Sequence, residues 1–253
     1  MSANPNHHFF DGFYQEIWQQ MMPAQLTSKE VGHLIGTYGL NKQTPVLDLM
    51  CGQGRHALAL ARSGIPVTAV DNLASYVQPL TALANQESLP LRAICENLLD
   101  WVPLAGHHWA LCMGNSLNFF SPEELPVVLQ KVSDSLVDGG YFWVNSWSIA
   151  EIILPQELDG QSSTATVGRF QHTNRFAIRY NPLRLEIESR IEDENGQVEE
   201  KIGIDFLFSV EELRELLAAA GLRLMKVESV PGKRNFQPGA PRVYLLSQKQ
   251  VLE

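Results

Sequence analysis

Short apolar runs alternate with helical patterns through the middle of the chain. The runs at 45–50, 66–70, 91–95, 109–113 and 141–146 have the length of buried strands. Strands that alternate with helices are typical of a parallel sheet covered by helices on both faces. We therefore predict an α/β fold: a Rossmann-like, doubly wound, mostly parallel seven-stranded sheet with an antiparallel final hairpin and a small antiparallel β insert.

The predicted helices carry start signals. Residues 9–22 place aromatic and aliphatic side chains at three- and four-residue spacing, which indicates an amphipathic helix. Thr27 and Glu30 have the spacing of a capping box and predict the start of the next helix. Ser121-Pro122-Glu123-Glu124 predicts a further helix, which we expect to end before a turn at Asp138-Gly139-Gly140.

The last third of the chain changes its pattern. Polar and apolar residues alternate from about 166 to 208, with a hairpin turn at Asn195-Gly196, and predict a small antiparallel insert packed on one edge of the main sheet. A capped helix and strands at 222–230 and 243–247 would complete the sheet. We expect four parts: an N-terminal helical lid at 1–40, a cofactor-binding core at 41–160, the insert at 161–208, and a C-terminal helix and hairpin at 209–253.

Composition changes this picture mainly by exclusion. The formal net charge is −9, which disfavours a nucleic acid as partner because such proteins usually present a basic field. The three cysteines are scattered and the histidines form no convincing metal set, so no metal is expected. His7 and His8 are near a terminus that we expect to be mobile. No membrane span and no signal peptide are recognisable, which predicts a cytoplasmic protein; the oligomeric state stays open.

The candidate chemistry lies between the first predicted strand and the helix that follows it. Gly52 and Gly54 let the backbone approach a bulky ligand, and the helix start offers free N–H groups. With Ala57 they also satisfy the dinucleotide fingerprint GxGxxG/A. Asp48 separates the two interpretations, because a carboxylate there repels a pyrophosphate but attracts the ammonium group of S-adenosylmethionine. Asp71 closes the second strand and can accept the ribose hydroxyls of either cofactor.

The segment VLDLMCGQGRHALALARSGIPVTAVD, at 46–71, resembles motif I and the acidic ribose loop of class I S-adenosylmethionine-dependent methyltransferases. The family pattern is acid-x-Gly-x-Gly-x-Gly, and Met50 stands where its first glycine usually falls. Segments similar to later family motifs follow in order at 95–97, 112–117 and 138–145. The layout, insert included, is similar to small-molecule N-methyltransferases that act on glycine or amino sugars.

The resemblance implies S-adenosyl-L-methionine as cofactor and S-adenosyl-L-homocysteine as product. It also implies that the N-terminal helix is a lid over the methionine end, where the aromatic faces of Tyr14 and Trp18 suit a sulfonium cation. From the residues and the resemblance together, we expect the following cofactor contacts: Tyr14, Trp18, Asp48, Met50, Cys51, Gly52, Gly54, Asp71, Asn72, Asn97, Leu98, Met113 and Gly114.

Substrate contacts are expected mainly at the carboxyl edge of the sheet, where open α/β sheets bind ligands. The candidates are Asn115, Asn118, Asn145, Trp147, Arg179 and Arg234. No compelling catalytic base is recognisable, which favours an amine acceptor, since hydroxyl and carbon nucleophiles generally need a base or a metal. We therefore predict a methyltransferase (EC 2.1.1.-) for a small molecule, acting at an amine nitrogen. A non-catalytic S-adenosylmethionine-binding protein, an NAD-linked oxidoreductase and a methyltransferase for a macromolecule remain alternatives.

Overall fold

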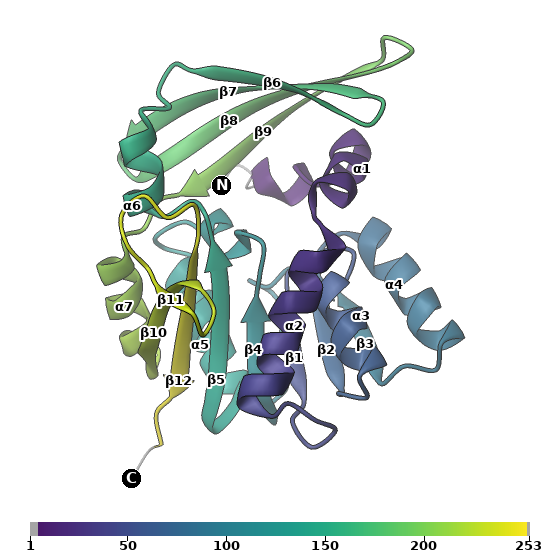
Figure 1. Ribbon diagram of the computed structural model, residues 1–253, viewed down its shortest axis with the longest axis vertical. Coiled ribbons are helices and arrows are strands. Elements are labelled where there is room, and N and C mark those ends of the chain that lie inside the picture. The colour runs from purple at the N-terminus through teal and green to yellow at the C-terminus, as the bar shows by residue number, and fades with distance from the viewer. Residues whose placement is uncertain (1–4, 252–253) are drawn as a thin grey trace.

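The main sheet organises the molecule (Figure 1). The computed structural model describes residues 5–251. The main-sheet strands are β1 (Val46–Leu49), β2 (Val67–Asp71), β3 (Leu91–Cys95), β4 (His107–Cys112), β5 (Leu136–Ser146), β10 (Leu222–Val230), β11 (Arg234–Asn235) and β12 (Val243–Lys249). Their order is β11-β10-β12-β5-β4-β1-β2-β3. The strands from β5 to β3 are parallel to their neighbours, whereas β12, β10 and β11 pair antiparallel.

Helices cover both faces of this sheet, as the alternation of strands and helices predicts. The helical elements are η1 (Pro5–His8), α1 (Gly12–Met21), α2 (Ala24–Tyr38), α3 (Arg55–Arg62), α4 (Ala74–Gln86), η2 (Ser116–Phe119), α5 (Leu125–Ser135), α6 (Ala150–Ile153), η3 (Leu154–Gln156) and α7 (Val210–Ala219). On β12, Val243 and Leu245 pack with α5 and α7, and Tyr244 and Leu246 pack with α2 and α3. Because successive side chains point to opposite faces, one strand serves both cores.

The insert forms a second sheet of its own. Its strands are β6 (Ser162–Val167), β7 (Phe170–Tyr180), β8 (Leu183–Asp193) and β9 (Val198–Phe206), antiparallel in that order. Figure 1 shows this roof sheet, β6–β9, across the carboxyl ends of the parallel strands, with α1 and η1 beneath it. The prediction that the insert packs on one edge of the main sheet is therefore wrong. The chain enters the insert after the carboxyl end of β5 and leaves it at the start of α7. The insert therefore lies over the carboxyl end of the main sheet.

Three local predictions need correction. The second helix begins at Ala24, with Pro23 as its N-cap, so Thr27 is not a cap residue. The main sheet has eight strands rather than seven, because β11 adds a short edge strand. The turn expected at Asp138-Gly139-Gly140 is an irregular part of β5, where a side chain on Gly140 would lie 2.8 Å from the Val137 carbonyl oxygen. Within residues 5–251, no helix is both long and apolar enough to cross a membrane.

Candidate cofactor and acceptor site

The loop between β1 and α3 adopts a conformation that suits glycine. Met50, Gly52 and Gly54 all have positive φ angles, of 51°, 56° and 77°. Gly54 is the N-cap of α3, and a Cβ atom there would lie 2.6 Å from the Leu80 side chain. Gly54 therefore lets the loop lie against α4 and does not itself line the cavity described next. Met50 holds the left-handed conformation without the freedom of glycine.

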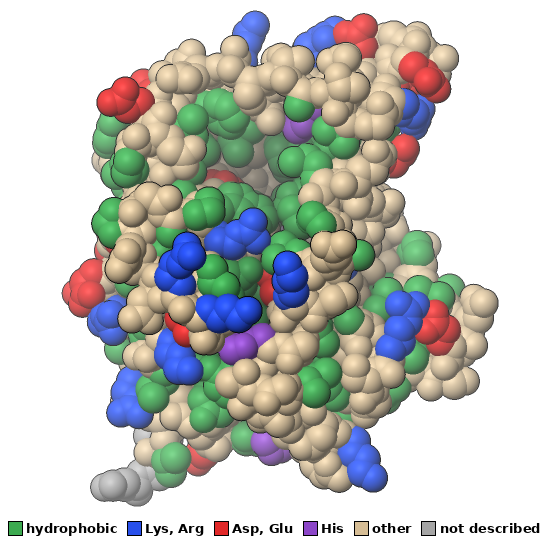
Figure 2. Space-filling model, in the orientation of Figure 1, with side chains coloured by type: hydrophobic (Ala, Val, Ile, Leu, Met, Phe, Trp, Pro, Cys, Tyr) green, Lys and Arg blue, Asp and Glu red, His purple; other side chains and the backbone are tan. Residues whose placement is uncertain are grey.

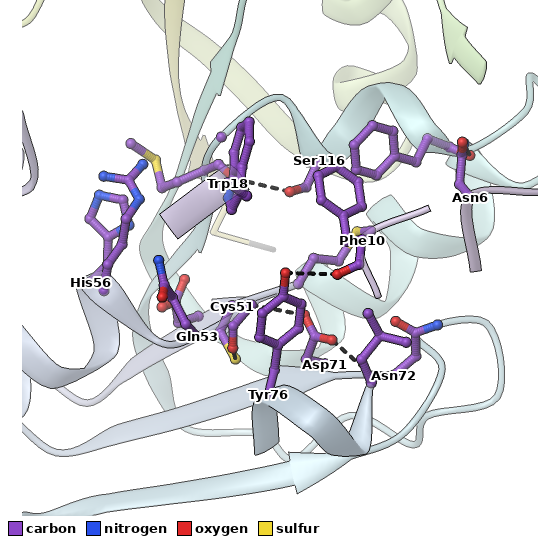
Figure 3. A pocket seen from close by; sticks show the side chains of 18 residues that line it. Asn6, Phe10, Trp18, Cys51, Gln53, His56, Asp71, Asn72, Tyr76 and Ser116 are labelled. Carbon is purple, nitrogen blue, oxygen red and sulfur yellow. Dashed lines mark hydrogen bonds between the residues drawn. The ribbon is translucent and has the colours of Figure 1, made fainter. Parts of the chain in front are cut away.

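A cavity with about 710 Å³ of empty space lies beside this loop (Figure 3). It is bounded by the ends of β1, β2 and β4 and by the N-terminal segment. An adjoining cavity of about 430 Å³ shares Met50, Asp71 and Asn72 with it and is also lined by Asn97 and Leu98. The expected cofactor residues that line the larger cavity are Trp18, Asp48, Met50, Cys51, Gly52, Asp71, Asn72, Met113 and Gly114.

Asp71 ties the end of β2 to the glycine loop. Its two carboxylate oxygens accept the Gly52 N–H at 2.8 Å and the Leu73 N–H at 2.9 Å. Burial raises the pKa of Asp71, and these N–H groups partly oppose that shift. The Asn72 N–H also stabilises the carboxylate, which leaves about one of its roughly four acceptor positions for a ligand hydroxyl. The side chain therefore fits a ribose contact while it also stabilises the loop.

Asp48 is a buried carboxylate on β1, the strand that pairs with β2. Burial raises its pKa to about 6, although the charges of His56 and Arg55 and the Ala57 N–H favour its ionised form. Its Oδ2 accepts that N–H at 3.1 Å, at the start of α3. A second oxygen thus remains for a cationic ligand group. This geometry fits the predicted contact with the methionine ammonium.

Glu30 connects the loop to the rest of the fold, and the sequence offered it only as a capping residue. Its carboxylate contacts His56 Nε2 at 2.8 Å, Arg55 Nη1 at 3.1 Å and the Tyr244 hydroxyl at 2.8 Å. Burial opposes its ionisation, but these partners outweigh burial and lower the pKa of Glu30. Glu30 thereby positions Arg55 and His56, which line the cavity.

The N-terminal segment is an ordered wall of the site, contrary to the expectation of a mobile end at His7. Asn6 exchanges two hydrogen bonds with the backbone of Ile204 in β9, at 2.7 and 2.8 Å. The Tyr76 hydroxyl donates to the Phe10 carbonyl at 2.9 Å, as Figure 3 shows. Asn6, Phe10 and Tyr76 line the cavity and were missed. The density of aromatic residues at 9–22 was the available signal for Phe10.

The adenine-side candidate, Asn97, has local partners. Its Oδ1 accepts the Leu99 N–H at 2.9 Å, and its Nδ2 lies 3.3 Å from His7 Nε2. The first bond is a turn contact that an asparagine makes without any ligand. Asn97 and Leu98 nevertheless line the smaller cavity next to Asp71. This is where the family resemblance places the adenine of the cofactor.

Aromatic side chains separate the cavity from the roof sheet. Trp18 lines the cavity and lies 5.9 Å, between ring centroids, from Trp147. Tyr14 stacks beside Trp18 at 6.4 Å but does not line the cavity. It meets His172 of β7 edge to face at 5.5 Å. Tyr14 therefore belongs to the contact between α1 and the roof.

Asp205, near the end of β9, is a second buried carboxylate that sequence reasoning missed. Its Oδ2 accepts the Ser148 hydroxyl at 2.6 Å and the Asn115 amide at 3.0 Å. Burial raises the pKa of Asp205 to about 6. Burial, and then the Asp205 charge, raise the pKa of Tyr14 as well, which places that charge close to α1. Over residues 5–251, Asp205 makes no ion pair.

The three asparagines proposed as substrate contacts are buried and bonded to the protein. Asn115 Oδ1 accepts the backbone N–H groups of Trp147 and Ser148. Asn118 donates to the Ser148 and Phe206 carbonyls, and Asn145 donates to Val243. Asn115 and Asn118 tie the segment after β4 to the end of β5 and to the roof sheet, whereas Asn145 ties β5 to β12 and its buried Oδ1 has no partner among the described residues. The bonds of Asn115 and Asn118 give no support to a role as substrate contacts.

The two arginines proposed as substrate contacts lie away from the cavity. Arg179 pairs with Glu186 at 3.1 Å on the roof sheet. Arg234 lines a different hollow, beside α2. Trp147, at 5.9 Å from Trp18, is the proposed substrate residue that lies next to the cavity wall.

The comparison with protein families decides what this fold and site represent. Residues 46–140, from β1 into β5, match the family described as a methyltransferase domain. This match favours the methyltransferase interpretation of the glycine loop and Asp71. The match gives no support to the NAD-linked alternative. No curated protein matches the sequence.

Solved methyltransferase structures share the fold over nearly the whole chain. An S-adenosylmethionine-dependent methyltransferase from Clostridium acetobutylicum is 15% identical, with 94% of this chain and 96% of that chain covered at a TM-score of 0.80. The CcbJ methyltransferase from Streptomyces caelestis is 17% identical, with 97% and 99% covered at 0.80. CalS10, an amino pentose methyltransferase from Micromonospora echinaspora solved with S-adenosylmethionine bound, is 17% identical, with 95% and 98% covered at 0.69. At these identities the likeness extends to the fold, roof sheet included.

Proposed function

We propose that this methyltransferase acts on a small molecule and transfers the methyl group to an amine nitrogen. The observation that carries the amine assignment is Asp205, a buried carboxylate without an ion pair among the described residues. S-adenosylmethionine supplies an electrophilic methyl group. The chain must hold that cofactor, align the acceptor, exclude water and receive a proton.

The cofactor would lie along the two adjoining cavities. Asp71 would accept the ribose hydroxyls, and Asn97 and Leu98 would flank the base in the smaller cavity. Asp48 would face the methionine ammonium at the other end. Trp18 would cover the sulfonium, since aromatic faces attract a cation. All five residues lie on segments that are fixed by backbone hydrogen bonds or by buried packing.

Asp205 would serve the acceptor. An aliphatic amine is a cation at neutral pH and must lose a proton before its lone pair can attack a methyl carbon. A carboxylate with a pKa of about 6 and no cationic partner stabilises the ammonium and then accepts that proton. Trp18 lines the cavity and Trp147 lies 5.9 Å from Trp18, and aromatic rings there also favour a cation.

Two further observations support a small acceptor. The roof sheet and η1 cover the carboxyl edge, and Asn6 joins them through its bonds to Ile204. A macromolecular chain has less room there than a compact ligand. CalS10 is named as an amino pentose methyltransferase, and KedS8 from Streptoalloteichus, 16% identical with a TM-score of 0.65, as a sugar N-methyltransferase. Both share the fold and fit the same acceptor chemistry.

The test is a methyl-transfer assay with a panel of small amines and their alcohol analogues, followed by variants. We expect turnover of amines only. Asp205→Asn should lower kcat at least about hundredfold, the usual contribution of a positioned proton acceptor. Glu188→Gln neutralises an exposed carboxylate on the same sheet and should keep the wild-type rate. Methylation of the alcohols instead, or an undiminished rate in Asp205→Asn, would refute the proposal.

A further inference from the structure

A second hollow lies between α2 and the loop at 231–241 and has about 1680 Å³ of empty space open to solvent. Four cationic side chains line it: Lys29, Lys233, Arg234 and Arg242. Figure 2 shows Lys and Arg side chains gathered in the middle of this face, below the hollowed region under the roof sheet. We call this feature, defined by the four cations, the basic basin.

These four cations have no acidic partner in the part of the chain from 5 to 251. The ion pairs found there use other basic residues, such as Arg55, Arg62 and Arg169. Grouped like charges repel one another, in a protein whose net charge is −9. Such a group is unusual unless an anion offsets the repulsion.

The nearby acidic side chains are already committed. Glu30 lines the basin, but its carboxylate is held by His56, Arg55 and Tyr244. Glu228 is buried and accepts the Gly232 N–H at 3.1 Å. Neither carboxylate pairs with a cation of the basin, so the basin keeps a positive field.

The basin is also held in shape by the fold. Gly232 has a φ of 66°, and a side chain there would lie 2.7 Å from the His33 ring, so the loop lies directly against α2. Arg234 belongs to β11, which pairs with β10. Arg242 interacts with the Tyr244 hydroxyl. The backbone that carries Arg234 and the loop beside it are therefore fixed before any ligand binds, which lowers the entropy lost on binding.

We propose that the basic basin binds a small, multiply charged oxyanion of the phosphate type. Two arginines offer planar donor pairs that match phosphoryl oxygens, and the lysines add point charges. The basin is a local hollow rather than an extended basic stripe, which disfavours a nucleic acid. Glu30 forms part of its wall and holds Arg55 and His56 of the cofactor cavity, so the two sites are neighbours.

The first experiment is calorimetric titration of the full-length protein with pyrophosphate, which does not depend on methyl transfer. The wild type should bind it saturably, and Lys233→Ala/Arg234→Ala should bind it at least about tenfold more weakly because two charged hydrogen-bond donors are lost. Lys42→Ala/Arg223→Ala removes the same charge from exposed positions outside the basin and should bind within about twofold of wild type. Absence of saturable binding, or an equal loss in both double variants, would overturn the proposal.

The second experiment distinguishes a free anion from an anionic group of the acceptor, and only this arm rests on the proposed function. O-phosphoethanolamine and inorganic phosphate are titrated in the presence of S-adenosylhomocysteine. Tighter binding of the phosphorylated amine, lost in Asp205→Asn, assigns the anion to the acceptor. Equal affinities assign the basin to a free anion. A protein that binds pyrophosphate but methylates no amine would keep the basin and refute only the amine assignment.

Discussion

The glycine-loop region and the roof sheet each contain one buried aspartate with nearly the same acidity. Burial raises the pKa of both Asp48 and Asp205 to about 6. Their partners differ. Asp48 lies near the charges of His56 and Arg55, whereas Asp205 receives hydrogen bonds only from the neutral Ser148 and Asn115.

This difference separates a carboxylate that the protein compensates itself from one that it does not. The buried charge of Asp48 has Arg55 and His56 in its surroundings before any ligand binds, and Glu30 holds both side chains in place. A buried charge without a partner costs free energy, so it persists where a function requires it. In our proposal, the missing cation at Asp205 is the ammonium of the acceptor.

The largest effect that separates the two carboxylates is on cofactor affinity. Asp48→Asn should weaken S-adenosylmethionine binding about hundredfold, because a charged hydrogen bond to the ligand ammonium is lost. Asp205→Asn should leave the affinity within about threefold of wild type, because it faces the acceptor. Calorimetry of both variants with S-adenosylmethionine and S-adenosylhomocysteine measures this directly. A large loss in Asp205→Asn together with normal binding in Asp48→Asn would reverse the assignment of the two sites.

A smaller effect concerns stability as a function of pH. The pKa of Asp205 rises from an ordinary 3.8 to about 6 in the folded protein. Between these values the folded state holds the proton more tightly than the unfolded state, so the free energy of unfolding falls as pH increases and stays lower above pH 6. Asp205→Asn has no ionisable group at this position, so its free energy of unfolding does not fall in this way as pH increases. At pH 7.5 the variant should be more stable than wild type by about 3 kcal/mol, and near pH 4 the difference should fall below about 1 kcal/mol.

Asp193, in the same sheet, provides a control of opposite sign. Burial opposes its ionisation, but N–H groups of Gln197 and Asn195 outweigh burial and lower the pKa of Asp193. Asp193→Asn should therefore be less stable than wild type at pH 7.5. Urea denaturation at both pH values measures all three proteins. If Asp205→Asn is also destabilised at pH 7.5, its carboxylate has a compensating partner, and the contrast with Asp48 fails.

The cofactor region was predictable because its chemistry is local in sequence. Asp48, the glycines and Asp71 lie on consecutive strand–loop units, so the pattern itself indicates that they meet at the carboxyl edge. Asn97 and Gly114 were expected from the family resemblance, which places cofactor contacts after the third and fourth strands. The two helical layers are also a consequence of alternating strands and helices. Only Met50 departs from the pattern within this region.

The strands of the roof sheet could be predicted from the sequence, but their contribution to the site could not. Alternation indicates that β7–β9 form an antiparallel sheet, yet it does not say where that sheet lies. Asp205 reaches Asn115 across 90 positions of sequence, and Asn6 reaches Ile204 across 198. Contacts of this length leave no local pattern. The role of Glu30 was predicted wrongly for a related reason. The spacing of Thr27 and Glu30 matches a capping box, but the side chains that Glu30 contacts lie on α3 and β12.

The smallest effect concerns Met50, where the glycine-loop region departs from its own family pattern. Met50 has a φ of 51°, a conformation that costs a side-chain-bearing residue about 1 kcal/mol, and its side chain packs against the core beside both cavities. Met50→Ala loses the packing and keeps the strain, whereas Met50→Gly loses the packing and relieves the strain. The glycine variant should therefore be the more stable of the two by about 1 kcal/mol, the reverse of the usual order of alanine and glycine. Urea denaturation of both variants decides this, with Met113→Ala and Met113→Gly as the matched pair on β4's carboxyl side, where φ is not positive and alanine should be the more stable. The usual order at Met50 as well would mean that the loop relaxes out of the left-handed conformation, and the strain argument for this position would fail.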